Sequence, residues 1–193
     1  MLKEEFNKAF KQRCLEAGFS KKGNWYYRQA KGEFHDLLNV SYYSYSCKTA
    51  IGLFAGIRNL SVEGLYERFT NNRLKEPLSM FCVNIGYLGS GNSFKDWCLT
   101  EDIGAVINEV TMEIKQYANP FYSEYGDIPR LIKAFENMEL TIDKEQQFFM
   151  LPLLYYISNQ KEKGMDYFMQ KKKENFKIDD YKNRFMDRYT YDL

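Results

Sequence analysis

The sequence is poor in the residues that most often perform catalysis or bind metals. It has a single histidine, His35, and its four cysteines, Cys14, Cys47, Cys82 and Cys98, include no Cys-x-x-Cys pair. Zinc sites are built largely from these two residue types, and histidine is the side chain that most readily exchanges protons near neutral pH. We therefore expect no metal site, no cofactor, and a protein that leans away from enzymatic activity. The cysteines are expected to be free, buried thiols.

The chain also lacks an excess of one charge and a long hydrophobic run. Its 27 basic and 26 acidic residues leave a net charge of +1, which provides no long-range field for a polyanion or an anionic membrane. The longest apolar stretch, residues 148–157, contains Pro152 and is far shorter than the ~20 residues of a spanning helix. The first residues do not resemble an export signal. These features predict a cytoplasmic protein with no membrane partner, for which nucleic acid is an improbable ligand.

Aromatic residues are abundant. The chain has 16 tyrosines, 15 phenylalanines and two tryptophans. Such side chains bury large areas, carry a polar group in tyrosine and tryptophan, and are enriched at the centres of protein interfaces. The composition therefore favours a protein that packs and binds, with another protein as its expected partner and a small-molecule ligand as an alternative.

Apolar periodicity predicts an α+β fold. A helix over residues 2–17 should end at Gly18, and β-prone runs follow at residues 25–28, 34–45, 51–58 and 80–87. Helical spacing then dominates, with one helix from residue 103 ending at Asn119 and Pro120 and further helices to the end of the chain. Ser61 and Thr100 are expected as N-caps, Asp143 and Gln146 resemble a capping box, and Pro152 should bend or restart the helix that contains it. We expect an N-terminal helix, an antiparallel sheet of about four strands, helices packed on one face, and a C-terminal helical extension. The predicted domains are residues 1–137, an α+β sheet domain, and residues 138–193, a helical extension packed on the same core.

Three motifs carry a resemblance to a known family. The first is the helix stop with the first strand, Gly18-Phe19-x-Lys21-x-Gly23-x-x-Tyr26-Tyr27-Arg28. The second is the strand that ends in Asn39-Val40. The third is a strand that turns at glycine, Phe81-x-Val83-Asn84-Ile85-Gly86. Over roughly residues 1–135 the chain resembles the bacterial family known as domain of unknown function 4304. The resemblance implies an α+β sheet domain of bacterial origin and supplies no catalytic residues. By analogy with other small bacterial families, it suggests a toxin-neutralising immunity protein.

Strand alternation indicates where a binding surface would lie. In residues 34–45, the even-numbered positions share one face and the odd-numbered positions, His35 and Tyr43 among them, share the other. The candidate binding surface comprises Trp25, Tyr27, Arg28, His35 and Tyr43. The leading hypothesis is a non-enzymatic protein-binding domain. Two alternatives stay open: a hydrolase or transferase that uses dispersed carboxylates and tyrosines, and a nucleic-acid-binding module that uses the cations and aromatic rings of residues 21–28.

Overall fold

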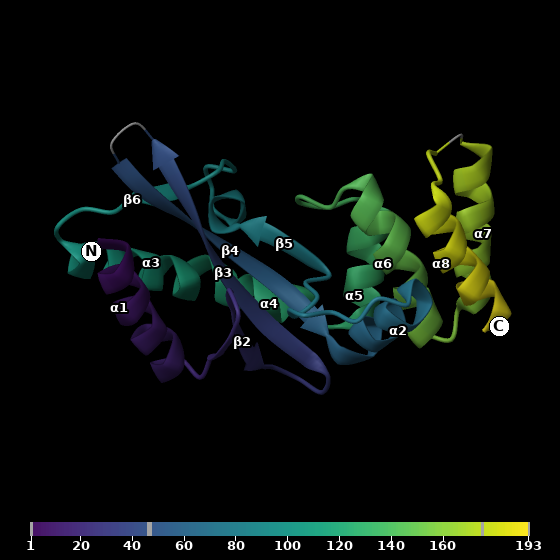
Figure 1. Cartoon of the computed structure of the whole chain (residues 1–193), viewed down its shortest axis with the longest axis horizontal. Helices are drawn as coiled ribbons and strands as arrows, with labels where there is room; N and C mark the ends of the chain where they lie inside the picture. Colours follow the sequence, from purple (N-terminus) through teal and green to yellow (C-terminus); the bar gives the residue numbers. More distant parts are fainter. Residues whose placement is uncertain (1, 46–47, 175, 193) are drawn as a thin grey trace.

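The structure, a computed structural model, describes residues 2–45, 48–174 and 176–192. It has the predicted α+β fold, with an antiparallel sheet, an N-terminal helix and C-terminal helices (Figure 1). In chain order the elements are α1 (Leu2–Glu16), β1 (Ser20–Lys22), β2 (Trp25–Gln29), β3 (Phe34–Tyr45), β4 (Lys48–Asn59), α2 (Leu60–Thr70), β5 (Phe81–Asn84), the 3₁₀ helix η1 (Ile85–Leu88), β6 (Asp96–Cys98), α3 (Ile103–Glu113), the π-helical turn η2 (Ile114–Ala118), α4 (Asn119–Tyr125), α5 (Ile128–Glu136), α6 (Lys144–Ile157), α7 (Lys161–Lys173) and α8 (Asp180–Tyr191).

The long β3–β4 hairpin is the centre of the sheet. The strands run in the order β1-β2-β3-β4-β5, and β6 also pairs with β4. The flanking strands are short: β2 pairs with residues 35–39 of β3, β5 with residues 54–57 of β4, and β6 with residues 50–52 of β4. The sheet thus has six strands rather than about four. Both β1 and β6 are only three residues long, too short to show a periodic pattern.

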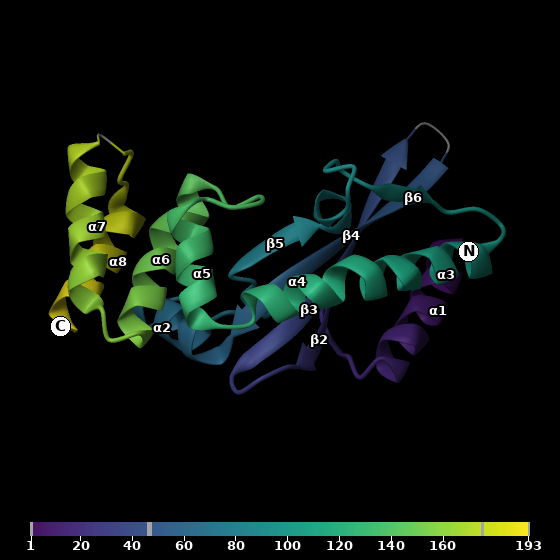
Figure 2. The ribbon, with the colours of Figure 1, turned by 180° about the vertical axis from the view of Figure 1, so that it is seen from behind.

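One face of the sheet packs against helices, as the predicted α+β fold requires. Phe34, Asp36 and Leu38 are buried on this face, and Tyr26, the cross-strand partner of Leu38, meets the ring of Phe10 in α1 edge-on at 5.2 Å between centroids. Figure 2 shows α3 and α4 crossing β3 and β4 on this side, whereas Figure 1 shows the same strands from the other side. The helix-covered face therefore contains the core of this part of the molecule.

The predicted helix end at Asn119 and Pro120 is wrong. The chain stays helical through α3, η2 and α4, which form a nearly continuous rod (Figure 2). The amide of Asn119 donates to the carbonyl of Ile114, five residues back. Because this π-type turn shifts the hydrogen-bond pattern just before the proline, Pro120 lies in the first turn of α4, where its missing N–H has little effect.

Other local signals have mixed outcomes. Gly18 has φ of 82° and ends α1 as predicted, with the amide of Phe19 bonded to the carbonyl of Cys14 at 2.9 Å. The capping box of Asp143 and Gln146 is also confirmed. By contrast, the N-caps of α2 and α3 are Asn59 and Asp102, where Ser61 and Thr100 were expected. In addition, α6 continues through Pro152, which was expected to bend or restart it.

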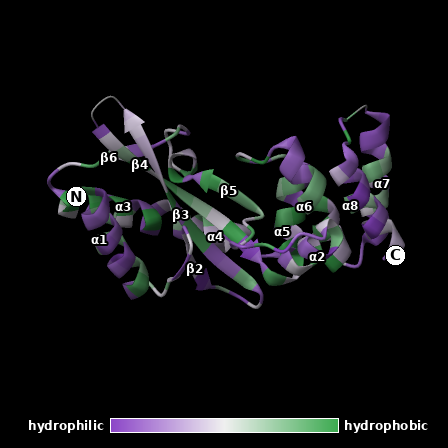
Figure 3. Cartoon of the chain, in the orientation of Figure 1, coloured by the Kyte–Doolittle hydropathy of each residue, from purple (hydrophilic) through white to green (hydrophobic). Residues whose placement is uncertain are grey.

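The helices α2 and α5 to α8 form a group at one end of the sheet (Figure 1). Phe69 of α2 meets the rings of Phe185 and Tyr189 in α8, at 6.1 and 5.7 Å. Figure 3 shows α5 and α6 as mostly hydrophobic and α8 as mostly hydrophilic. Phe81 of β5 joins this group to the sheet, since its ring lies 5.9 Å from that of Phe135 in α5. Within the described residues, no helix is long and apolar enough to cross a bilayer.

Candidate functional site

Within the described residues, no helix covers the second face of the sheet at the end where β3 meets β4 (Figure 1). Its other end is closed by α2 and the connection from α2 to β5. Arg58 of β4 pairs with Glu63 of α2 at 2.7 Å, and Glu63 also accepts from the amide of Leu78 at 2.8 Å. Ser79 packs directly over Gly56. In the part of the chain that the structure describes, the opposite end of this face is therefore the one left open and free of helices.

Four aromatic rings cluster on this open end. The ring of Phe94 meets that of Tyr43 edge-on at 5.6 Å and that of Phe54 at 6.2 Å, and Tyr43 stacks with Tyr45 at 6.3 Å. Phe94 is 42% exposed and Tyr45 is 49% exposed. We call Tyr43, Tyr45, Phe54 and Phe94 the aromatic surface. It is an exposed apolar group held in place by its own ring contacts, a feature typical of interaction sites.

Gly52 and Asn84 create this arrangement. A Cβ atom at Gly52 would lie 2.9 Å from Cε2 of Tyr43 and 3.3 Å from Cζ of Phe94, so only glycine lets both rings approach the strand this closely. The buried Asn84 side chain clamps the segment that carries Phe94: its Oδ1 accepts from the amide of Lys95 at 2.9 Å and its Nδ2 donates to the carbonyl of Lys95 at 3.0 Å. The position of Phe94 is thus fixed through the backbone of its neighbour Lys95.

Charges near the aromatic surface are engaged with neighbours. A hydrogen bond to Asp96 raises the pKa of Tyr45 above its usual value. Lys95 pairs with Glu113 at 2.8 Å and with Glu109 at 3.3 Å. The surface consequently presents rings and hydroxyl groups, and two charged residues beside it, Lys95 and Asp96, already have hydrogen-bond partners.

Of the predicted site residues, Tyr43 belongs to the aromatic surface and Trp25 lies on the same face. Trp25 pairs across the sheet with Asn39, which in turn pairs with Phe54. Directly paired residues of neighbouring antiparallel strands point to the same side, so Trp25 borders the aromatic surface. The alternation along residues 34–45 thus holds for Tyr43, and the assignment of both residues to a binding surface stays a prediction.

Tyr27 and His35 lie on this face but at its closed end. Their rings meet edge-on at 6.1 Å, and His35 is eight residues from Tyr43 along β3, about 26 Å away at the rise of a strand. His35 therefore shares a face with Tyr43, as the alternation predicts, but it lies far from Tyr43 along the strand. Burial, and then the neighbouring Arg58 guanidinium, lower the pKa of His35. Its Nδ1 has no hydrogen-bond partner among the described residues.

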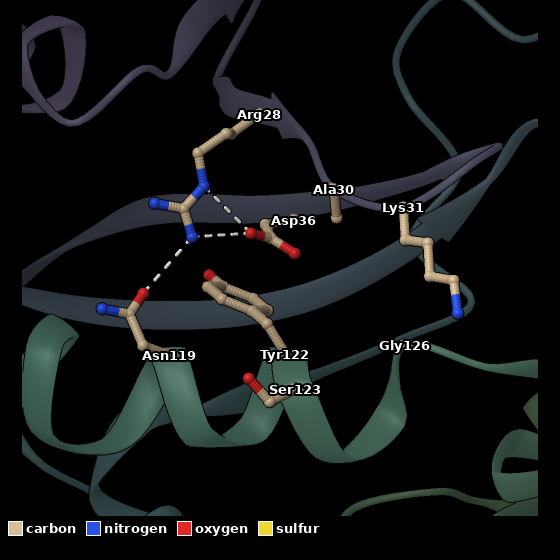
Figure 4. Close-up of a pocket in the computed structure, with 8 residues that line it drawn as sticks. All are labelled: Arg28, Ala30, Lys31, Asp36, Asn119, Tyr122, Ser123 and Gly126. Carbon is tan, nitrogen blue, oxygen red and sulfur yellow. Dashed lines mark hydrogen bonds and ion pairs between the residues drawn. The ribbon is translucent and has the colours of Figure 1, made fainter.

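Arg28 points to the opposite face, away from the other four candidates. Its Nη2 and Nε donate to the same oxygen of Asp36 at 2.6 and 3.0 Å, and Nη2 also approaches Oδ1 of Asn119 at 3.3 Å. These groups line an open hollow of about 560 Å³ between β2, β3 and α4, into which Tyr122 also projects (Figure 4). The predicted five-residue surface is thus divided between the two faces of the sheet.

The hollow offers limited chemistry. Burial raises the pKa of Asp36, while the bond and charge of Arg28 oppose that shift. Asp36 is the one acidic residue among the described residues that line the hollow, whereas glycoside-type hydrolysis uses a pair of carboxylates. Its carboxylate is already bound by Arg28. The hollow therefore gives the hydrolase or transferase alternative no specific support.

Two of the three cations in residues 21–28, Lys21 and Arg28, face aromatic rings within the protein. Lys21 lies 5.3 Å from the ring centroid of Tyr26, and Arg28 lies 4.6 Å from that of Phe19.

The described residues contain no group of three or more His, Cys, Asp or Glu side chains suited to a metal ion. The cysteine prediction is wrong for Cys98, which is exposed, and Cys47 lies outside the described residues.

Sequence reasoning missed Phe54 and Phe94 as site residues. Phe54 lies two residues after Gly52 and two before Gly56, and this spacing already places it on the same face as both glycines. Phe94 follows a glycine- and serine-rich loop, and nothing in the local sequence shows that it returns to a strand 40 residues earlier. Only the pairing of β6 with β4 brings it there.

Comparison of the chain with family models, curated proteins and solved structures found no match. The resemblance to domain of unknown function 4304 is accordingly neither supported nor contradicted and stays a prediction.

Proposed function

We propose that this chain is a non-enzymatic protein-binding domain that engages its partner through the aromatic surface. The observation that carries the proposal is the exposed cluster of Tyr43, Tyr45, Phe54 and Phe94 on the open end of the sheet. Tyrosine and other large rings dominate the energetics of protein interfaces, particularly where they are already rigid before binding. Here the glycine beneath them and the ring contacts between them supply that rigidity.

In its most specific form, the proposal is that the domain neutralises a bacterial toxin by covering a surface that the toxin needs. This form draws on the sequence resemblance and its analogy with immunity proteins. The exposed rings are the kind of surface that such a contact uses, and Lys95 and Asp96 beside them already have partners. The partner would then be a protein with a complementary apolar surface at the centre of the contact.

Substitution of Phe94 tests the proposal. The tagged full chain is used to recover proteins from an extract of its native host, and the wild type is compared with Phe94→Ser and with Met112→Ser. Met112 is 67% exposed on α3 and lies outside the aromatic surface, so it is a matched control for the loss of an exposed apolar side chain. We expect a defined protein to bind the wild type and Met112→Ser equally, and Phe94→Ser at least about thirtyfold more weakly, as for a central interface residue.

Two results would contradict the proposal. One is a partner that binds all three proteins with equal affinity, and the other is recovery of no specific protein by the wild type. The toxin version makes the further demand that the recovered protein inhibits growth on its own and that the wild type, but not Phe94→Ser, relieves the inhibition.

A further inference from the structure

Building on the proposed function, we propose that the partner contributes an extended, uncharged peptide segment that adds to the sheet as a strand along residues 40–45 of β3. Addition of a strand to a sheet edge is a common mode of peptide recognition, in which backbone hydrogen bonds provide affinity and neighbouring side chains provide selectivity. The aromatic surface alone does not determine whether the partner presents a folded surface or an extended segment.

Residues 40–45 of β3 are paired on one side only. Along its whole length β3 pairs with β4, but β2 reaches no further than Asn39. The carbonyl of Phe34 accepts from the amide of Ala30 on the β2 side at 2.9 Å. Because the direction of backbone groups alternates along an antiparallel strand, Val40, Tyr42 and Ser44 also direct their N–H and C=O groups to that side. No described strand lies there to accept them.

Two other edges of the sheet, those of β1 and β5, carry features that oppose strand addition. The outer strand β1 carries Lys21 and Lys22, and lysine on an edge discourages further pairing. On the outer edge of β5, the carbonyl of Cys82 accepts from Thr141 at 3.0 Å. Residues 40–45, Val-Ser-Tyr-Tyr-Ser-Tyr, contain no charge and no proline and consist largely of β-prone types. They lack the features that usually prevent strand addition.

The surroundings of the edge favour a single strand over a second copy of the chain. At one end, Nδ2 of Asn39 donates to the carbonyl of Asn24 in the β1–β2 turn, and on the helix-covered side Oη of Tyr42 donates to Asn7 of α1. A second copy would bring its own turn and helix to this place, whereas a peptide needs only the ~4.8 Å of one strand spacing. A residue of the added strand opposite Tyr43 would lie beside the aromatic surface, which suits an uncharged side chain there.

Ser44→Pro tests the inference at the backbone. Ser44 is exposed, and its N–H points away from β4, so proline removes an edge donor while leaving the β3–β4 bonds in place. Proline also favours an extended conformation at the preceding Tyr43, which is already in a strand. Ser44→Ala is the matched control, because it removes the same hydroxyl and retains the N–H.

The probe is a random dodecapeptide library selected against the wild-type full chain. We expect selected peptides with uncharged, β-prone cores that bind Ser44→Ala like the wild type and Ser44→Pro about tenfold more weakly or worse. Bound peptide should slow the hydrogen exchange of the Tyr42 and Ser44 amides. N-methylation of alternate peptide amides should abolish binding, and this result does not depend on the folding of any variant. Failure to select a peptide, or peptides insensitive both to Ser44→Pro and to N-methylation, would overturn the inference.

The same peptides separate this inference from the proposed function. Peptides that lose affinity for Phe94→Ser but bind Ser44→Pro normally would leave the aromatic surface as a binding site and refute strand addition. Peptides that are indifferent to both substitutions would contradict both proposals. Concentration-dependent dimers of the free chain that Ser44→Pro abolishes would also refute a peptide occupant, because the edge would then bind a second copy.

Discussion

Two buried tyrosines on the helix-covered side differ in whether their hydroxyl groups have partners. Oη of Tyr122 donates to the carbonyl of Leu37 at 2.7 Å, whereas Oη of Tyr26 has no partner among the described residues. We expect Tyr122→Phe to lower the free energy of unfolding by about 1 kcal/mol, and Tyr26→Phe to raise it by a similar order, because Tyr26 loses water on folding without gaining a bond. Chemical denaturation of both variants measures this difference. Equal effects of the same sign would contradict it.

At the residue scale, the sequence predicts which face of a strand a side chain occupies better than it predicts its neighbours. Alternation places Tyr43 on the open face. The same rule places the consecutive residues Tyr27 and Arg28 on different faces of the sheet, although Tyr27 and Arg28 were assigned to one surface. The contacts between Phe94 and Tyr43 depend instead on the path of the connection before β6. Such long-range contacts have no local signal.

A glycine in α7 separates local helix preference from packing. A Cβ atom at Gly164 would overlap the ring and hydroxyl of Tyr189 in α8, whereas a Cβ atom at Gly64 in α2 would meet nothing within 4 Å. Alanine normally stabilises a helix interior by roughly 0.5–1 kcal/mol relative to glycine, and we expect this gain for Gly64→Ala. Gly164→Ala should instead lower the free energy of unfolding by about 1–3 kcal/mol, as overpacking does. Urea unfolding of the two variants provides the measurement, and a stabilised Gly164→Ala would refute the predicted overlap.

Helices and long strands are predictable at the scale of elements because their patterns span several turns or pairs. The stop at Gly18 and the capping box at Asp143 depend on a few adjacent residues and were predicted correctly. The continuation of the rod past Pro120 was not predicted, because a π-type turn leaves no distinctive pattern in the sequence. Nor was the three-residue strand β6, which is stabilised by its pairing with β4.

For the molecule as a whole, the rings around Phe81 predict cooperative unfolding. Phe81 contacts Phe121 at 5.4 Å and Phe135 at 5.9 Å, so the sheet and the helical group share one core. Both tryptophans, Trp25 and Trp97, lie in strands, so their fluorescence reports on the sheet while far-ultraviolet circular dichroism reports mainly on the helices. We expect the two signals to give the same thermal midpoint. Phe135→Ala should lower the midpoint of both signals together and should lower the free energy of unfolding by about 3–5 kcal/mol.

Two separate midpoints would contradict this expectation and would support independent domains. The predicted boundary after residue 137 falls between α5 and α6, which pack against each other, and it stays a prediction. The sequence predicts the class of the fold and the order of its longer elements. It does not predict that α2, which directly follows β4, packs with helices more than 70 residues further on, since this depends on tertiary contacts alone.

The absence of a side chain at Gly52 has an evolutionary consequence. Any larger residue there would displace the rings of Tyr43 and Phe94, so selection for the aromatic surface acts on a position that itself contributes no contact atoms beyond its backbone. In related sequences we expect residues 52, 43 and 94 to change together, with glycine retained wherever both rings are present. A lineage that keeps the rings but loses the glycine would have had to rebuild the surface on a different strand geometry.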